Sequence, residues 1–118
     1  MYEVRKRLEI AGSHQLNLNY ESACRNLHGH NWIVEITLRG KKLNENGMLA
    51  DFKWIKNKIH KRLDHKFIND VISVNPTAEN IAKWICDTLN EELVGSVCCK
   101  VKVQESEGNV AIYIKEEE

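Results

Sequence analysis

Residues 31–39 show the clearest periodicity in the sequence, because apolar and mainly polar side chains alternate there. Successive side chains of a β-strand point to opposite faces, so this pattern predicts a strand with one buried face. The apolar positions are Trp32, Val34, Ile36 and Leu38. Looser versions of the same alternation predict three further strands, at residues 2–11, 97–105 and 109–115.

Two amphipathic helices are predicted between the second and third strands. Asp51 is a suitable N-cap for a helix that runs to about Leu63, and Thr77 lies at the start of a second helix that Gly95 ends. Both segments carry an apolar stripe that can cover one sheet face. The stripes consist of Phe52, Ile55, Ile59 and Leu63 in the first helix, and of Ile81, Trp84, Ile85, Thr88, Leu89 and Leu93 in the second.

The order of elements, β-β-α-α-β-β, predicts an α+β fold. In this fold two helices cover one face of a four-stranded, mainly antiparallel sheet. The 118 residues correspond to a single domain, residues 1–118. A sheet this small has edges to protect, so association between copies of the chain is expected.

Charge and composition argue against several classes of function. The 17 basic residues balance the 17 acidic ones, so there is no broad positive field, and no nucleic-acid partner is expected. No segment is apolar for long enough to be a signal peptide or a membrane span, and no membrane partner is expected. The four cysteines form no Cys-x-x-Cys pair, which suits the reducing cytoplasm, where we expect the protein.

Two histidines separated by one glycine, His28-Gly29-His30, continue the strand predicted from residue 31 onwards. They share the parity of Trp32, so their imidazoles point the same way on the apolar face. Neutral imidazoles side by side suit Zn²⁺, which takes nitrogen ligands at about 2.0–2.1 Å. His14 follows the first strand on the parity of its apolar residues and reaches the same point if the two strands pair. The alternative is a set of satisfied core or rim histidines.

A site made of three histidines keeps a place for water or substrate, as catalytic zinc sites do. Structural zinc sites instead fill four positions and commonly use cysteine. Cys24, four residues before His28, leaves three interpretations open. As a fourth ligand it would close the site, as a thiolate near a dication or Arg25 it would act as a base or nucleophile, and otherwise it is an inert loop cysteine.

Further candidate groups lie at the ends of the helices. Asp64 and His65 follow the first helix, and a carboxylate beside an imidazole can set its tautomer and raise its basicity. An aspartate at a helix end next to a surface histidine is the plainer interpretation. Thr77 and Glu79 open the second helix, where a capping hydroxyl and an acid near the helix dipole are sufficient to explain them.

Glu105 ends the inward row predicted for the third strand. That row consists of Val97, Cys99, Val101, Val103 and Glu105. A buried carboxylate is costly unless it is paired, so a ligand that presents two donors would satisfy it. Alternatively, the alternation stops at Val103 and Glu105 is exposed.

Together these motifs resemble the 6-pyruvoyl-tetrahydropterin synthase family, and more closely its short bacterial branch, which makes 6-carboxy-tetrahydropterin. The matching stretches occur in family order and cover nearly the whole chain. They are Ile10-Ala11-Gly12-Ser13-His14, Cys24-x-x-x-His28-Gly29-His30, Gly47-x-x-x-Asp51-Phe52, Leu63-Asp64-His65, Asn75-Pro76-Thr77-Ala78-Glu79-Asn80 and Glu105. The chain departs from the usual Phe-x-Ala-Ala-His pattern before the first histidine, where Ile10 and Gly12 replace Phe and Ala, so different local packing is expected.

The resemblance implies a role for each candidate residue. Zinc would be bound by His14, His28 and His30. Cys24 would be the base rather than a ligand, and Asp64 with His65 would form an acid–base relay. Glu105 would anchor the pterin and join the relay, with Thr77 and Glu79 near the ring. The implied fold is the tunnelling fold, whose subunits join their sheets into barrels as trimers or dimers of trimers, with active sites between subunits.

The implied substrate is 7,8-dihydroneopterin triphosphate. In the carboxy branch the products are 6-carboxytetrahydropterin, acetaldehyde and triphosphate, on the route to queuosine and related deazapurines. The nearest alternative is 6-pyruvoyl-tetrahydropterin synthase, which eliminates triphosphate without cutting the carbon chain. An alternative of a different class is a non-catalytic zinc-binding interaction domain with a closed Cys-His₃ site.

Overall fold

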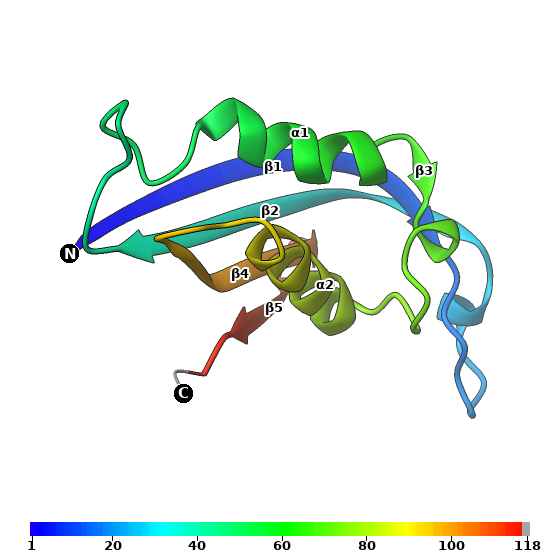
Figure 1. Ribbon diagram of the computed structural model, residues 1–118. Coiled ribbons are helices and arrows are strands. Elements are labelled where there is room, and N and C mark those ends of the chain that lie inside the picture. Colours follow the sequence, from blue (N-terminus) through cyan, green and yellow to red (C-terminus); the bar gives the residue numbers. More distant parts are fainter. Residues whose placement is uncertain (117–118) are drawn as a thin grey trace.

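A long antiparallel pair of strands, β1 (Tyr2–His14) and β2 (His28–Gly40), forms the centre of the fold (Figure 1). The computed structural model describes residues 1–116. All 13 residues of β1 pair with β2, and the last pair of the ladder sets His14 opposite His28. The even-numbered side chains in the inner part of both strands are buried, as the alternation predicts.

The sheet has five strands in the order β3-β1-β2-β4-β5. β4 (Val97–Ser106) runs antiparallel to β2, and β5 (Asn109–Ile114) runs antiparallel to β4. β3 (Lys66–Phe67) pairs in parallel with β1. The four predicted strands are present and the sheet is mainly antiparallel, but the predicted number of four is wrong. β3 has only 2 residues, which is too few to show a period in the sequence.

The helices α1 (Phe52–Leu63) and α2 (Ala78–Asn90) pack on the buried face of the sheet (Figure 1). Both begin where their caps predict. The Asp51 carboxylate accepts a hydrogen bond from the Lys53 backbone N–H at 2.8 Å, and Thr77 Oγ1 accepts one from the Asn80 N–H at 3.2 Å. Phe52 is 47% exposed and so lies outside the predicted stripe.

One hydrophobic cluster fills the space between the helices and the sheet. Full burial of side chains such as leucine and isoleucine contributes roughly 1.5–3 kcal/mol each, so this cluster is the main source of stability. Its sheet members include Leu8, Ile10, Trp32, Val34, Ile36, Leu38, Val101 and Val103, and its helical members include Ile55, Ile59, Leu63, Ile81, Ile85 and Leu89.

A β-bulge in β4 changes which of its residues face the core. Leu38 pairs with Cys98, and the next pair along the ladder skips Cys99. An extra residue in one strand reverses the parity of the residues beyond it. Cys98 is therefore fully buried, whereas Val97 is 44% exposed and Cys99 is half-buried. The predicted inward row is wrong for Val97 and Cys99 and correct from Val101 onwards.

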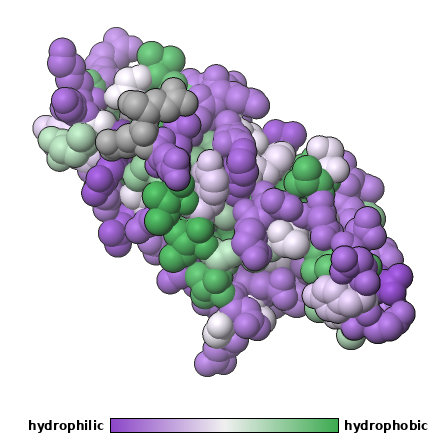
Figure 2. Space-filling model, turned by 90° about the horizontal axis from the view of Figure 1, so that it is seen from below, coloured by the Kyte–Doolittle hydropathy of each residue, from purple (hydrophilic) through white to green (hydrophobic). Residues whose placement is uncertain are grey.

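The second face of the sheet is not covered by α1 or α2, and β5 lies at its edge (Figure 1). Three apolar side chains of β5 stand in a row on this face, at 45%, 53% and 65% exposure. They are Val110, Ile112 and Ile114. Figure 2 shows hydrophobic residues gathered in a row on the side seen from below. Within residues 1–116, neither helix has the length and apolar character to span a bilayer.

Candidate metal centre and active site

Three histidines meet at the end of the β1–β2 pair where their chains diverge. His14 pairs with His28 across the ladder. His30 lies two residues further along β2, where it pairs with Gly12. One nitrogen from each ring lies within 4.8 Å of the others, and His14 is completely buried. The convergence predicted from strand parity is therefore present in the structure.

Backbone carbonyls set the orientation of two of these rings. His14 Nδ1 lies 2.8 Å from the Pro76 carbonyl oxygen, and His28 Nδ1 lies 2.7 Å from the Asn26 carbonyl oxygen. A carbonyl only accepts, so each Nδ1 carries a proton, and in the neutral form of each ring the Nε2 keeps a lone pair. The two Nε2 atoms are 2.9 Å apart. Lone pairs directed at one point are what a metal cation requires, and carbonyls that accept from the other ring nitrogen commonly orient histidine ligands.

His30 supplies a third nitrogen that lacks a partner. Its Nε2 is buried and forms no hydrogen bond, although Glu105 Oε1 lies 3.4 Å away. Burial lowers the pKa of His30, partly offset by the Glu105 carboxylate. Burial also lowers the pKa of His14, against the opposing effect of the Pro76 carbonyl. Neutral rings are the form that binds metal, so the residues present fit a zinc ion.

Trp32 forms a wall behind the histidines. Its ring packs edge-on against His14 and His30, with centroids 4.9 and 5.1 Å apart, and is 1% exposed. The indole N–H donates to the Gly12 carbonyl oxygen at 3.1 Å. The sequence interpretation treated Trp32 only as a core residue, because alternation shows burial and not what a side chain packs against.

Cys24 lies in a short 3₁₀ turn, η1 (Ala23–Arg25), in the loop that joins β1 to β2. The Ser22 hydroxyl caps this turn by accepting a hydrogen bond from the Cys24 N–H at 3.2 Å. The Cys24 thiol is free and half-buried. Within the described residues, the group close enough to share a metal ion contains histidines only, so a closed Cys-His₃ site is not what the geometry favours.

Asp64 and His65 form a pair at the end of α1, where Asp64 is the C-cap. Asp64 Oδ1 accepts a hydrogen bond from the Ala11 N–H at 2.9 Å. Its Oδ2 lies 3.5 Å from His65 Nε2 and 3.6 Å from His60 Nε2. The carboxylate therefore has two imidazole neighbours. The sequence interpretation missed His60, although its i,i+4 spacing from Asp64 on the helix was a usable signal.

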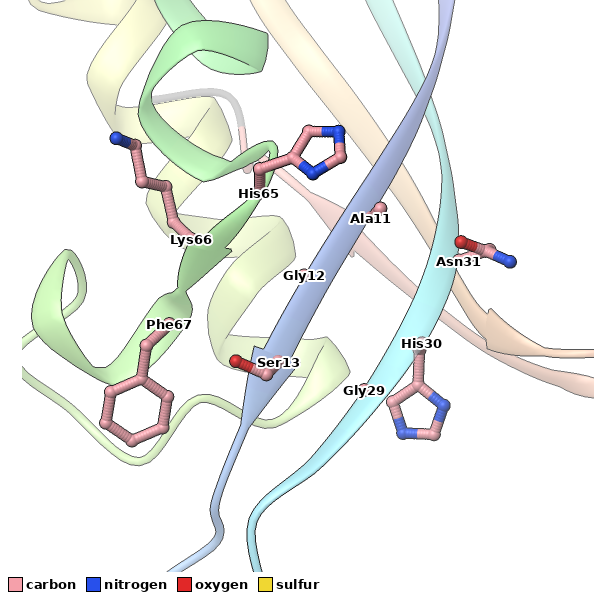
Figure 3. A pocket seen from close by; sticks show the side chains of 9 residues that line it. All are labelled: Ala11, Gly12, Ser13, Gly29, His30, Asn31, His65, Lys66 and Phe67. Carbon is pink, nitrogen blue, oxygen red and sulfur yellow. The ribbon is translucent and has the colours of Figure 1, made fainter.

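His65 has an unusual backbone for a non-glycine residue, with φ of 57°. Its N–H donates to the Ala11 carbonyl oxygen at 2.6 Å, and its side chain is 83% exposed. A left-handed conformation of this kind is held only when the surrounding structure imposes it, and such residues cluster at functional sites. His65 borders the cavity in Figure 3, of about 480 Å³, which small residues on β1 and β2 leave open. These small residues are Ala11, Gly12, Ser13 and Gly29.

Glu79 and Glu105 line a second cavity, of about 290 Å³. Glu105 belongs to β4 and Glu79 to the first turn of α2, so the cavity lies between helix and sheet. Glu105 also approaches His30, so its side chain links this cavity to the histidine cluster. Thr77 caps α2 two residues before Glu79. The half-buried Glu105 is thus brought to the histidines. His65 lines the same cavity as His30, whereas Cys24 stays in the loop between β1 and β2, outside the histidine group of the described residues.

A small α+β protein that gathers three imidazoles next to a substrate-sized cavity belongs to the class of candidate metalloenzymes. The family is shown by sequence. The chain belongs to the 6-pyruvoyl tetrahydropterin synthase family, whose family model matches residues 3–116.

Named relatives carry two different activities. The 6-carboxy-5,6,7,8-tetrahydropterin synthase of Bacillus subtilis (strain 168) is 29% identical over 123 residues, covering 95% of this chain and 84% of the relative. The 6-pyruvoyl tetrahydrobiopterin synthase of Homo sapiens is 35% identical over 133 residues, covering 94% and 90%. The solved structure of Caenorhabditis elegans 6-pyruvoyl tetrahydropterin synthase matches with a TM-score of 0.78 at 22% identity, covering 98% and 96%, which shows a shared fold.

Proposed function

We propose that this protein is a zinc-dependent 6-carboxy-5,6,7,8-tetrahydropterin synthase. It would convert 7,8-dihydroneopterin triphosphate and water to 6-carboxytetrahydropterin, acetaldehyde and triphosphate, a step toward queuosine and related deazapurines. The observation that carries the proposal is the convergence of His14, His28 and His30, whose ring nitrogens lie within 4.8 Å of one another. The Bacillus subtilis relative with this name supports the choice of reaction.

The metal ligands would be His14, His28 and His30, three neutral nitrogens that leave a coordination place open for substrate. When bound there, Zn²⁺ supplies Lewis-acid polarisation of the substrate's side-chain oxygens. The protein's own contribution is orientation, because the carbonyls of Pro76 and Asn26 keep two rings in one tautomer. The buried Trp32 closes the far side and limits the access of water.

Cys24 is the proposed base that removes a proton from the substrate side chain. A free, half-buried thiol outside the ligand group is available for that role. The Asp64–His65 pair is the proposed relay, in which Asp64 orients the imidazole and His65 moves protons to and from the side-chain oxygens. The high exposure of His65 suits a group that meets its substrate at an open surface.

The pterin ring is proposed to bind in the cavity lined by Glu79 and Glu105. A carboxylate such as Glu105 can accept two hydrogen bonds from an amino-pyrimidine edge, and its approach to His30 would place the ring beside the metal. Thr77 and Glu79, at the start of α2, would lie near the ring. No nucleic-acid or membrane partner belongs to this proposal.

The active unit is proposed to be a homo-oligomer, a trimer or a hexamer, with sites between subunits. The row of Val110, Ile112 and Ile114 on the edge strand β5 is an exposed apolar surface that a second copy would cover. Most of the opposite edge, formed by β1, is also open because β3 pairs with two of its residues only. The proposed location is the cytoplasm, a compartment in which the four cysteines stay reduced.

The direct test is incubation of the zinc-loaded protein with 7,8-dihydroneopterin triphosphate. Mass spectrometry of the pterin product and an enzymatic assay for acetaldehyde should report 6-carboxytetrahydropterin and one acetaldehyde per turnover. Removal of zinc with a chelator should stop the reaction, and added zinc should restore it. Absence of turnover in the zinc-loaded oligomer would contradict the proposal.

A second candidate is 6-pyruvoyl-tetrahydropterin synthase, because the human relative with that activity in its name is 35% identical to this chain. The same incubation separates the two reactions. Triphosphate elimination alone would yield 6-pyruvoyl-tetrahydropterin and no acetaldehyde.

A further inference from the structure

Two asparagine side chains hold the segment that follows β1 as a partner strand would. The Gln15 N–H donates to Asn69 Oδ1 at 2.9 Å, and Asn69 Nδ2 donates to the Gln15 carbonyl oxygen at 2.8 Å. Asn75 makes the same pair of bonds with Asn17, at 2.9 and 3.0 Å. Each carboxamide thus satisfies both backbone groups of one residue. We refer to Asn69 and Asn75 as the asparagine clamps.

The segment held by the clamps carries the Cys24 turn on its other side. The Leu16 N–H, between the two clamped residues, donates to the Cys24 carbonyl oxygen at 3.0 Å. In an extended chain, the backbone N–H and C=O groups of successive residues point to opposite sides. The backbone groups of Gln15 and Asn17 therefore face the clamps, and the N–H of Leu16 faces the Cys24 turn. Cys24 is therefore one hydrogen bond away from a clamped segment.

The clamps are themselves mounted on well-anchored elements. The Asn75 carbonyl oxygen accepts hydrogen bonds from the Thr77 N–H and from Asn80 Nδ2, both at 2.8 Å, at the start of α2. Asn69 lies in the 3₁₀ turn η2 (Ile68–Asp70), whose Ile68 is 1% exposed. Groups on packed elements hold a fixed position more closely than groups on free loops.

The clamps also supply the hydrogen bonds that tie this loop to the protein beyond β1 and β2. In the described chain, four hydrogen bonds join residues 15–27 to segments beyond the β1–β2 pair, and all four come from Asn69 and Asn75. The bond between Leu16 and Cys24 joins two parts of the same loop and cannot position the loop by itself. Ordering this connection costs the conformational entropy of its residues, and the clamp hydrogen bonds offset part of that cost.

We propose that Asn69 and Asn75 are positioning residues that fix Cys24 relative to the three histidines. The clamps place the segment that begins one residue after His14, and that segment places the Cys24 turn. The catalytic consequence rests on the role of Cys24 in the proposed function. The mechanical consequence, that the clamps restrain the thiol, does not depend on that role.

A third asparagine offers a matched control. Asn90 binds both backbone groups of Cys98, with the Cys98 N–H donating to Oδ1 at 2.8 Å and Nδ2 donating to the carbonyl oxygen at 3.0 Å. This clamp joins the end of α2 to β4 and leaves the Cys24 loop untouched. Asn90→Ala therefore removes the same two kinds of hydrogen bond at a different place.

The test measures iodoacetamide labelling of each cysteine in the zinc-loaded protein by peptide mass spectrometry. Asn69→Ala and Asn75→Ala should each accelerate labelling of Cys24 by roughly tenfold, since each removes two hydrogen bonds that oppose opening of the loop. Asn90→Ala should leave Cys24 labelling at the wild-type rate. The clamp variants should also lower kcat more than they raise KM, with zinc content unchanged.

Two outcomes would overturn the inference. One is wild-type labelling of Cys24 in both clamp variants, and the other is equal acceleration in Asn90→Ala. If an alanine variant does not fold, Asn75→Asp keeps the acceptor and loses the donor, and it should give a smaller acceleration in the same direction. Faster Cys24 labelling in the clamp variants, together with no turnover in any variant or in the wild type, would contradict the proposed function. It would still support the positioning role of Asn69 and Asn75.

Discussion

His14 and His28 face each other at the last pair of the β1–β2 ladder, with their Nε2 atoms 2.9 Å apart. Both rings donate from Nδ1 to a carbonyl, so in the neutral form of each ring the Nε2 lone pair points toward the other ring. A cation bound there would be shared by the two nitrogens. The strength of zinc binding should therefore depend directly on this pair.

Replacing His28 by alanine should weaken zinc binding by more than about 100-fold, because a lost ligand costs more than the roughly 10–100-fold lost with a residue that only orients a ligand. Competition with a chromophoric chelator measures the affinity. His60→Ala is the matched control, since that imidazole contacts Glu9 and Asp64 and lies outside the ligand group. Equal zinc affinity in His28→Ala and wild type would remove His28 from the site.

The zinc-free protein should lose stability as the pH falls from 7.5 to 5.5. Burial lowers the pKa of His14 and of His30 below the ordinary 6.5, so in this range the unfolded chain binds more protons than the folded one. Stability then rises with pH and is lost as the pH drops through the unfolded value. Urea unfolding at several pH values measures the slope. His14→Gln should flatten it.

Gly12→Ala should destabilise the protein by about 1–3 kcal/mol through overpacking. A methyl group at this position would lie 3.0 Å from Ile68 Cδ1 and 3.4 Å from the Leu63 carbonyl oxygen. Ile68→Val removes the closest atom, so the double variant should lose less stability than the sum of the two single variants. Chemical denaturation measures the three values, and strict additivity would show that the contact is not the cause.

Cys24→Ala should lower turnover by about 10²–10⁴-fold, the range expected for loss of a general base. Zinc content, measured by elemental analysis, should stay at the wild-type level because Cys24 lies outside the ligand group. Loss of zinc in this variant would instead make Cys24 a ligand. Cys99→Ala is a suitable control, since it removes another half-buried thiol from a different part of the sheet.

His65→Ala should reduce kcat by a similar factor while leaving the free energy of unfolding nearly unchanged. The side chain is 83% exposed, so its removal costs little packing. Asp64→Asn should reduce both activity and stability, because Asp64 Oδ1 accepts the Ala11 N–H and charge-assisted hydrogen bonds are the stronger kind. A His65→Ala enzyme with wild-type kcat would exclude the proposed relay.

Much of the candidate site could be predicted from local pattern. Alternation in β2 places His28 and His30 on the face of Trp32, and that parity is a property of any extended chain. The same argument worked less well in β4, where the bulge at Cys99 shifts the parity in a way that only the pairing with β2 reveals. The pattern predicts the direction of a side chain correctly where the geometry of its own strand sets that direction. It fails where the pairing with a neighbouring strand sets it.

The sequence by itself determined the strands, the helix caps and the common face of the three histidines, because these follow from short-range backbone geometry. The tertiary structure alone decided the register that sets His14 against His28, the fifth strand β3, and the asparagine clamps. The clamps join residues 54 and 58 positions apart in the chain. Partners at such separation are chosen by how the helices return the chain to the sheet, and no local period records that choice.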